Sequence, residues 1–170
     1  MLLSVVAALV LSAPAAPTVR LAVPLIRQAP ERCGPASLQM VLRFYGADSA
    51  AVVEAERAYD PVLRGALITD LAAAARRGGF DAEVATLNDS ALIDLLSGGV
   101  PPIVLYQNGP VVTVRHFAVV AGWVSPTREF ILHDGAARAR SMRREELIAR
   151  WRAAGSQALI VRRGRPAVAR

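Results

Sequence analysis

The sequence contains few of the residues from which proteins build cross-links and metal sites. Its 170 residues include one cysteine and two histidines, and all twenty of its basic residues are arginine. A single cysteine excludes an internal disulfide and any site made of several thiolates. With so few thiols and imidazoles a structural zinc site is not expected, and we expect no metal and no cofactor. A chain of this length should fold as one domain with its own core.

Charged residues are also scarce, at 20% of the chain against 54% hydrophobic residues, which excludes intrinsic disorder. The net charge of +6 is unevenly distributed: from Arg138 to Arg170 ten arginines stand against two glutamates, whereas the first 137 residues carry ten arginines and twelve acidic residues. A basic C-terminal third can attract an anionic partner, but more often it is a solvated helix face followed by a tail. Aromatic residues do not alternate with the basic ones, so we expect no nucleic-acid binding.

Beyond the N-terminus the chain has no apolar run long enough to cross a membrane. Residues 1–12 are almost entirely apolar, and the small residues Ala13 and Ala15 follow them. This pattern is typical of a secretory signal. Residues 1–16 are therefore predicted to be a signal peptide, and residues 17–170 a single domain with a basic C-terminal tail. We expect an exported protein, periplasmic or secreted; the alternative is that the apolar segment forms a first strand or helix of the domain.

Signals for helices come first along the chain, and signals for strands dominate afterwards. Apolar residues at helical spacing, with glycine, proline, aspartate or asparagine at the boundaries, predict helices over 33–45, 50–59, 68–77, 91–96 and 143–154. Apolar runs between turn residues predict strands over 19–26, 81–86, 102–106, 111–114, 116–124, 129–134 and 157–162. Pro24 limits the first of these strands to a sheet edge. Helices followed by mostly antiparallel strands predict an α+β fold.

The single cysteine stands where a helix is predicted to begin. Cys33 is followed by Gly34 and Pro35, and proline is favoured in the first turn of a helix. The helix dipole and the unpaired N–H groups at this end favour a thiolate, which is the form that attacks a carbonyl. Gln28 lies just upstream, where its amide could donate to the oxyanion formed by that attack. The alternative is that Cys33 is a small buried hydrophobic residue and Gln28 an ordinary surface residue.

A histidine and an aspartate mark two consecutive β runs. His116 opens the run 116–124, and Asp134 ends the run 129–134. If the two runs pair as a hairpin, residues whose numbers add up to 250 face each other, which places His116 opposite Asp134 and turns His133 to the other face. His116 could then act as a general base whose ring Asp134 orients. Alternatively, the histidine is a hydrogen-bonded structural residue and the aspartate belongs to an ordinary turn.

Taken together, these residues resemble a known family. The segment 28–45, in which Cys-Gly-Pro-Ala at 33–36 opens a helix, is similar to the bacteriocin-processing (double-glycine) cysteine peptidases and their stand-alone relatives, which belong to the papain-like superfamily. That family also has a histidine beginning an apolar strand, as at His116, and an aspartate ending the next strand, as at Asp134. The resemblance covers roughly residues 23–161. It implies a papain-like fold in which N-terminal helices, one carrying the nucleophile at its N-terminus, pack on a mostly antiparallel C-terminal sheet.

The resemblance also implies roles for four residues: Cys33 as nucleophile, His116 as general base, Asp134 as orienting residue and Gln28 as oxyanion donor. The sequence departs from the family pattern in two places, because Gly135 follows the aspartate where proline is usual, and Gln28 stands five residues before Cys33 where six is common. We expect an exported bacterial cysteine peptidase that hydrolyses a peptide or protein through a thioester acyl-enzyme. The alternatives are a transpeptidase or transamidase using the same acyl-enzyme, and a non-catalytic peptide-binding module.

Overall fold

The computed structural model describes residues 18–109 and 114–164. The predicted signal peptide, residues 1–16, lies outside the described residues, as do residues 165–170 of the basic tail. Of the predicted strand 111–114, only Val114 is described, and it begins a longer strand. Within the described ranges, none of the helices has the length and apolar character needed to cross a membrane.

The described chain is a mixture of helices and strands in the predicted order. The helices are α1 (Cys33–Phe44), α2 (Ser49–Glu56), α3 (Ile68–Arg77), α4 (Asp89–Ser97) and α5 (Arg144–Arg152). The strands are β1 (Val19–Arg20), β2 (Phe80–Thr86), β3 (Ile103–Asn108), β4 (Val114–Val124), β5 (Glu129–His133), β6 (Arg140–Arg143) and β7 (Gln157–Arg163). Local capping sets two of the helix starts: Asp48 accepts a hydrogen bond from the Ala51 N–H at 2.9 Å, and Asn88 accepts one from the Ala91 N–H at 3.0 Å.

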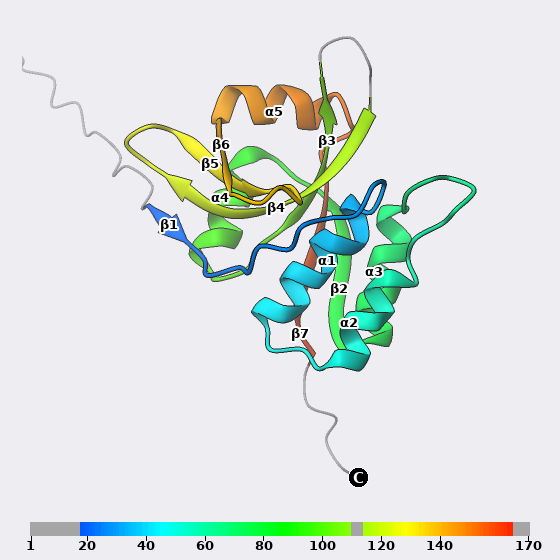
Figure 1. Cartoon of the computed structure of the whole chain (residues 1–170). Helices are drawn as coiled ribbons and strands as arrows, with labels where there is room; N and C mark the ends of the chain where they lie inside the picture. Colours follow the sequence, from blue (N-terminus) through cyan, green and yellow to red (C-terminus); the bar gives the residue numbers. More distant parts are fainter. Residues whose placement is uncertain (1–17, 110–113, 165–170) are drawn as a thin grey trace, which may run out of the picture.

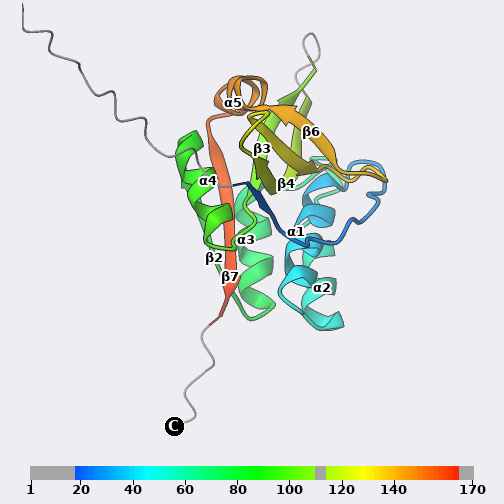
Figure 2. The same ribbon diagram turned by 90° about the vertical axis from the view of Figure 1, so that its left-hand side faces the viewer.

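The strands of the described chain form one antiparallel sheet. Its order is β2-β7-β3-β4-β5-β6, and β1 pairs with β4 beyond the end of β3. Helices α1, α2 and α3 lie on one side of the sheet, and α4 lies on the other (Figures 1 and 2). Helix α5 packs against β3, β5 and β6. The fold is therefore α+β, as the sequence predicts, with the helix that begins at Cys33 packed on the central strand β4.

Alternate residues of the central strands build two separate cores. Leu105 and Phe117 belong to the core beneath α1 and α3. Their chain neighbours Tyr106 and Ala118 belong to the core beneath α4 and α5. This alternation follows from the two-residue repeat of a β-strand. It buries β3 and β4 on both faces, so the segment that carries His116 rests on a rigid part of the molecule.

The pairing of β4 with β5 differs from the predicted register. Val119 faces His133, so the register next to the site differs by two residues from the assumed one. Farther along β4, Ala121 is an extra residue that forms a bulge, and after it Gly122 faces Ile131. The alternation of side chains between the two faces of a strand can be predicted from the sequence, but the position of a β-bulge cannot be predicted as simply. Since the shift next to the site is even, each side chain keeps its predicted face. Continued by one residue, this register would set Asp134 diagonal to His116 and not directly opposite.

Two strands differ from the prediction in length or existence. The predicted strand 19–26 is reduced to the two residues of β1, because the chain turns after Leu21, whose carbonyl oxygen accepts a hydrogen bond from the Val23 N–H at 2.8 Å. Strand β6 was missed, and its residues were assigned to the approach to a helix. Three of its four residues, Arg140, Ser141 and Arg143, are exposed and only Met142 is buried, so it has almost no apolar alternation to detect.

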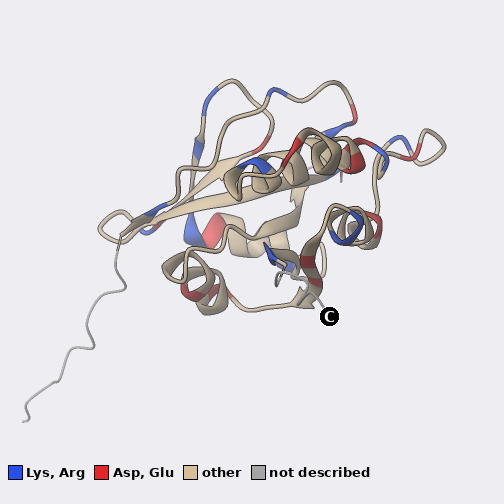
Figure 3. Ribbon diagram, turned by 90° about the horizontal axis from the view of Figure 1, so that it is seen from below, with Lys and Arg blue, Asp and Glu red and all other residues tan. Residues whose placement is uncertain are grey.

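Arginines of the basic C-terminal third have acidic partners within the protein. Arg144 forms an ion pair with Asp89, and Arg162 Nη1 lies 2.8 Å from Glu83 Oε1. Figure 3 shows basic and acidic residues interspersed over helices and loops. Ion pairs at exposed positions contribute little to stability. Their presence here favours a solvated surface over a docking site for an anionic partner.

Candidate active site

Cys33 is the first residue of α1 and lies half-buried against β4. Its neighbour Gly34 explains how the helix start comes so close to the strand. A Cβ added to Gly34 would lie 3.1 Å from the Ala66 Cβ and 3.2 Å from the Phe117 ring. Because glycine has no side chain, the first turn of α1 can pack directly on the segment of β4 that carries His116. This packing brings the thiol and the imidazole together from distant parts of the sequence.

The imidazole of His116 bridges the thiol and the loop after β5. Its Nε2 lies 2.9 Å from the main-chain carbonyl oxygen of Asp134. A carbonyl oxygen only accepts hydrogen bonds, so Nε2 carries a proton and Nδ1 keeps the free lone pair of the neutral ring. The imidazole is also close enough to the Cys33 thiol for the two groups to shift each other's pKa. The ring is thus held in the tautomer whose Nδ1 can take the thiol proton.

The thiol and the imidazole shift each other's pKa in opposite directions. Burial alone would raise the pKa of the Cys33 thiol, but the hydrogen bond with His116 and those from the Phe117 and Gly34 main-chain N–H groups lower it overall. Burial alone would lower the pKa of His116, but the hydrogen bond and negative charge of Cys33, with a smaller contribution from Asp134, raise it overall. Both shifts favour a thiolate–imidazolium pair, which is the reactive form of a cysteine nucleophile.

Asp134 reaches His116 through its main chain. In the described structure its carboxylate has other neighbours: Oδ1 accepts from the Ala136 N–H at 3.2 Å, and Oδ2 lies 3.9 Å from Arg140 Nη1. The carboxylate is still close enough for its charge to raise the pKa of His116. The residue predicted to orient the ring is therefore in place, but the atom that contacts the ring belongs to the backbone.

Gln28 lies against the residue that follows Asp134. Its main-chain N–H donates to the Gly135 carbonyl oxygen at 3.1 Å. Its side-chain Oε1 is buried and has no hydrogen-bond partner among the described residues. Gln28 is thus one residue removed from the carbonyl that holds His116. The four residues singled out in the sequence converge on one place, where α1, β4 and the loop after β5 meet.

A further residue beneath His116 was not singled out from the sequence. Tyr106 faces His116 in the β3–β4 pairing, with ring centroids 5.8 Å apart and ring planes at 85°. Tyr106 is fully buried, and this burial raises its pKa to about 12, so the phenol stays neutral. Pairing the predicted strands 102–106 and 116–124 as a hairpin could have found it, but the residues between them did not define a register.

A loop next to the nucleophile is tied to it by polar contacts. Glu31, two residues before Cys33, accepts hydrogen bonds from the Tyr59 hydroxyl at 3.1 Å and from Arg64 Nε at 2.7 Å. The Arg32 guanidinium lies 4.0 Å from the centre of the Tyr59 ring. The loop between α2 and α3 is therefore fixed beside the thiol. It exposes three apolar side chains, those of Val62, Leu63 and Leu67.

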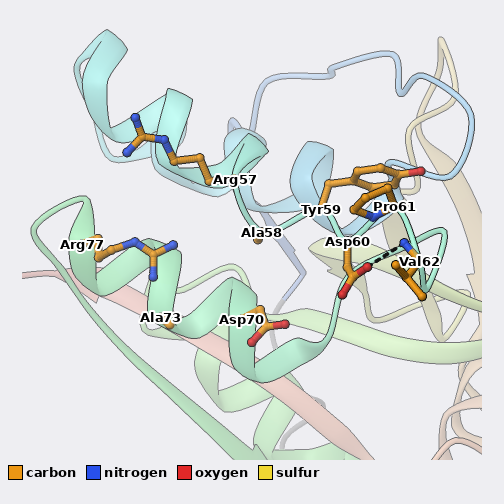
Figure 4. A pocket seen from close by; sticks show the side chains of 9 residues that line it. All are labelled: Arg57, Ala58, Tyr59, Asp60, Pro61, Val62, Asp70, Ala73 and Arg77. Atoms are coloured by element: carbon orange, nitrogen blue, oxygen red, sulfur yellow. Dashed lines mark hydrogen bonds between the residues drawn. The ribbon is translucent and has the colours of Figure 1, made fainter.

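The first residues of this loop also line a pocket of about 410 Å³ (Figure 4). The lining residues are Arg57, Ala58, Tyr59, Asp60, Pro61, Val62, Asp70, Ala73 and Arg77. None of the four predicted site residues is among them. Two of its charged groups, Arg57 and Arg77, are paired with Glu54. We therefore place the candidate reaction centre at Cys33 and not in this pocket.

Comparisons with known proteins agree with this geometry. The sequence profile described as the Peptidase_C39 like family matches residues 20–159. A putative C39-like peptidase from Bacillus anthracis superimposes with a TM-score of 0.71 at 18% identity, covering 88% of this chain and 100% of that one. The peptidase domain of Streptococcus ComA, described as a bifunctional ABC transporter involved in quorum sensing, gives 0.66 at 23% identity over 82% of this chain and 97% of that one.

A third solved structure is a double-glycine motif protease from an AMS/PCAT transporter, in complex with a leader peptide. It superimposes with a TM-score of 0.66 at 22% identity, over 85% of this chain and 96% of that one. No match was found among curated proteins. At these identities the solved structures show the fold, whereas the profile match spans most of the chain and shows the family. The chain belongs to the Peptidase C39-like family, and it is a cysteine peptidase.

Proposed function

We propose that this peptidase hydrolyses peptide bonds through a thioester acyl-enzyme formed on Cys33. One observation supports the proposal most directly: the His116 imidazole, whose Nε2 lies 2.9 Å from the Asp134 carbonyl oxygen, is close enough to the Cys33 thiol for the two groups to shift each other's pKa. The opposite shifts of the two pKa values support a thiolate that is already present before substrate binds. A thiolate beside an imidazolium has both the nucleophile and the proton that peptide cleavage requires.

In the acylation step, Cys33 Sγ attacks the scissile carbonyl carbon, and the carbonyl oxygen takes the negative charge. The Gln28 amide donates a hydrogen bond to this oxyanion. When the intermediate collapses, the C–N bond breaks and His116 gives its proton to the leaving amine. The amine-side product departs, and the acyl-side product stays on the sulfur as a thioester.

In the deacylation step, His116 takes a proton from water, which attacks the thioester carbonyl. The C–S bond breaks, the carboxylate product leaves and the thiolate–imidazolium pair is restored. An amine in place of water would give a transferase with the same acyl-enzyme. Product analysis with and without added glycine methyl ester separates the two: hydrolysis gives only free carboxylate, and transfer gives a product whose mass includes the added amine.

The substrate we propose is a peptide whose apolar side chains contact the loop between α2 and α3. Val62 is 89% exposed, and Leu63 and Leu67 are also exposed, which is unusual for large apolar residues next to a reactive group. The loop is fixed to Glu31, so its position relative to Cys33 is set before substrate binds. The double-glycine motif protease noted above was solved with a leader peptide, which supports peptide binding on this fold.

We also propose that the protein acts outside the cytoplasm. The apolar residues 1–12 and the small residues that follow support export with removal of residues 1–16. Expression of the full chain in a bacterium, followed by fractionation and N-terminal sequencing, tests this. A mature protein beginning near Pro17 in the periplasm or medium supports it, and an intact chain in the cytoplasm contradicts it.

The direct test of the proposed function uses a peptide library digested by the mature chain and analysed by mass spectrometry. Cys33→Ala should abolish cleavage at every site that the wild-type protein cuts, because no other side chain in the mechanism can form the thioester. A circular-dichroism spectrum and an unfolding midpoint like those of the wild type would show that the variant is folded. Cleavage retained by folded Cys33→Ala would contradict the proposal.

A further inference from the structure

The Gln28 side chain occupies the space in which residue 135 would have a side chain of its own. Gly135 is buried and has a φ of +83°. A Cβ added there would fall on Gln28 Oε1, and the Gln28 Cδ and Cγ atoms would each be 2.6 Å away. The main chains of the two residues are joined as well, by the hydrogen bond from the Gln28 N–H to the Gly135 carbonyl. The two residues therefore fit together only because one of them is glycine.

This contact sets which end of the Gln28 amide is left for the reaction. Oε1 is buried against Gly135 and has no donor among the described residues. A buried acceptor without a donor costs free energy, so it is the close packing against Gly135 that keeps the oxygen there. In a planar amide the oxygen and the NH₂ group are bonded to the same carbon and point in different directions. Because the oxygen faces Gly135, the NH₂ group is the part of the amide that is left to donate a hydrogen bond to the oxyanion.

We infer that Gly135 is a positioning residue for peptide cleavage: its missing side chain holds the Gln28 amide so that the NH₂ group serves the oxyanion. The inference rests on the proposed function and adds a residue that orients the donor without touching substrate. It predicts that an added methyl group at position 135 displaces the Gln28 amide. The three atoms nearest to that methyl group's position all belong to Gln28, so we expect the thiolate–imidazolium pair to stay intact.

Two reagents distinguish the oxyanion donor from the nucleophile. The acetyl group of p-nitrophenyl acetate passes to Cys33 Sγ through a tetrahedral oxyanion, as the S–C bond forms and p-nitrophenolate leaves. Iodoacetamide alkylates the same sulfur by displacing iodide, and no oxyanion forms. The ratio of the two rates therefore reports donation to the oxyanion and cancels any change in thiolate content. The release of p-nitrophenolate reads the first reaction even when the thioester is then hydrolysed, and intact mass reads the second, for which the chain has one cysteine.

Four variants are measured with both reagents: two single variants, their double variant and a matched control. Gln28→Ala should lower the ratio by about 10²–10³, the usual effect of removing one oxyanion donor. Gly135→Ala should lower the ratio by about as much. The ratio of the double variant should be no lower than that of either single variant, since both changes remove the same interaction. Gly99→Ala is the matched control: Gly99 has a φ of +76° with nothing within 4 Å of an added Cβ, so the substitution strains the backbone without a collision and should leave the ratio unchanged.

Denaturant unfolding gives a second readout if Gly135→Ala folds poorly. Gly135→Ala should unfold at a lower denaturant concentration than Gly99→Ala, and adding Gln28→Ala should recover the excess loss. A wild-type ratio in Gly135→Ala, an unchanged ratio in Gln28→Ala, or a double variant that falls well below both single variants overturns the inference. Wild-type Cys33 that reacts with iodoacetamide only after denaturation would overturn the proposed function itself, so the two failures are distinguishable.

Discussion

At the scale of single residues, the ring that activates the thiol is oriented by a main-chain atom. The Asp134 carbonyl oxygen accepts from His116 Nε2, and the position of that oxygen is fixed by the fold whichever side chain stands at residue 134. In enzymes where a carboxylate sets the tautomer of the base, removing that carboxylate costs about 10⁴ in rate because the wrong tautomer forms. Here the tautomer does not depend on the carboxylate, so the carboxylate should matter less.

Asp134→Asn tests this point. The asparagine Oδ1 can still accept from the Ala136 N–H and the backbone carbonyl is unchanged, so only the charge near His116 is lost. The acylation rate with p-nitrophenyl acetate should fall by far less than about 10⁴, whereas His116→Ala should lose the reaction almost completely. An Asp134→Asn variant as inactive as His116→Ala would mean that the carboxylate, and not the carbonyl, holds the ring.

The pKa of His116 should depend on the thiol. The hydrogen bond and charge of Cys33 raise the pKa of His116, while burial acts to lower it. Cys33→Ser removes this negative charge, whereas the burial that lowers the pKa remains. The pKa of His116 should therefore fall relative to the wild type. Nuclear magnetic resonance titration measures this directly. His133, the other histidine, is the internal control: burial lowers its pKa, and the substitution should not change it.

The sequence predicted which residues meet in the site, but not which atoms. The motifs around Cys33 and His116 each consist of residues that are neighbours in the sequence, so they can be recognised from the sequence alone. The Asp134 carbonyl contacts His116 in a register that differs by two residues from the assumed one, with a one-residue bulge at Ala121 between the site and the turn. The two departures from the family pattern also have a structural context: residue 135 is a glycine where Gln28 packs on it. No single-sequence rule reports such a fit between side chains.

At the scale of elements, the site depends on the first turn of α1 packing on β4. Gly34 is the contact point, with Ala66, Leu71 and Phe117 all within 3.2 Å of the place where a Cβ would stand. The helix dipole and the Gly34 N–H act on the thiol only while this contact is kept. A small outward shift of α1 would separate the thiol from His116 without unfolding the helix.

Gly34→Ala should therefore weaken both stability and reactivity. Overpacking a well-packed contact typically costs about 1–3 kcal/mol, and the shift should raise the pH at which Cys33 becomes alkylated. Urea unfolding and an iodoacetamide pH profile measure the two effects. Gly98→Ala is the control, because its added Cβ would make only ordinary 3.5 Å contacts at the end of α4. A Gly34→Ala variant indistinguishable from this control would show that the contact is not needed.

Elements with strong local signals were predictable from sequence, and those defined by their partners were not. Helices α2 and α4 begin directly after Asp48 and Asn88, an aspartate and an asparagine of the kind that marks the boundaries of the predicted helices. Strand β6 has one buried residue and exists because it pairs with β5. The strand predicted over 19–26 pairs only at Val19 and Arg20, because the chain turns away from β4 after Leu21. Pairing partners are tertiary information, and composition does not specify them.

At the scale of the whole molecule, the sheet separates α1, which carries Cys33, from a second core on its other side. Helix α4 covers the side of the sheet opposite to α1 (Figure 2). Leu92 of α4 is fully buried in that core. The overall fold class could be predicted because helix signals come first along the chain and strand signals dominate afterwards, which is typical of an α+β fold. The division into two cores came from structure, since one apolar run such as 102–106 contributes to both.

Leu92→Ala should lower stability while leaving the chemistry of the folded protein intact. A buried leucine replaced by alanine costs about 2–5 kcal/mol through lost transfer energy and the cavity left behind. The free energy of unfolding measures the loss, and the iodoacetamide pH profile under native conditions measures the site. A changed profile at pH values where the variant is fully folded would show that the two cores are coupled, contrary to this account.

The most direct test of the account is the alkylation rate of Cys33 in the folded protein as a function of pH, read by intact mass. The account predicts fast modification that persists well below pH ~8.5, the value for a free thiol, because His116 and the start of α1 lower the pKa of Cys33. It also predicts that His116→Ala moves the profile toward the free-thiol value. A wild-type rate that follows the free-thiol pKa, or no modification until denaturant is added, would contradict the thiolate–imidazolium pair.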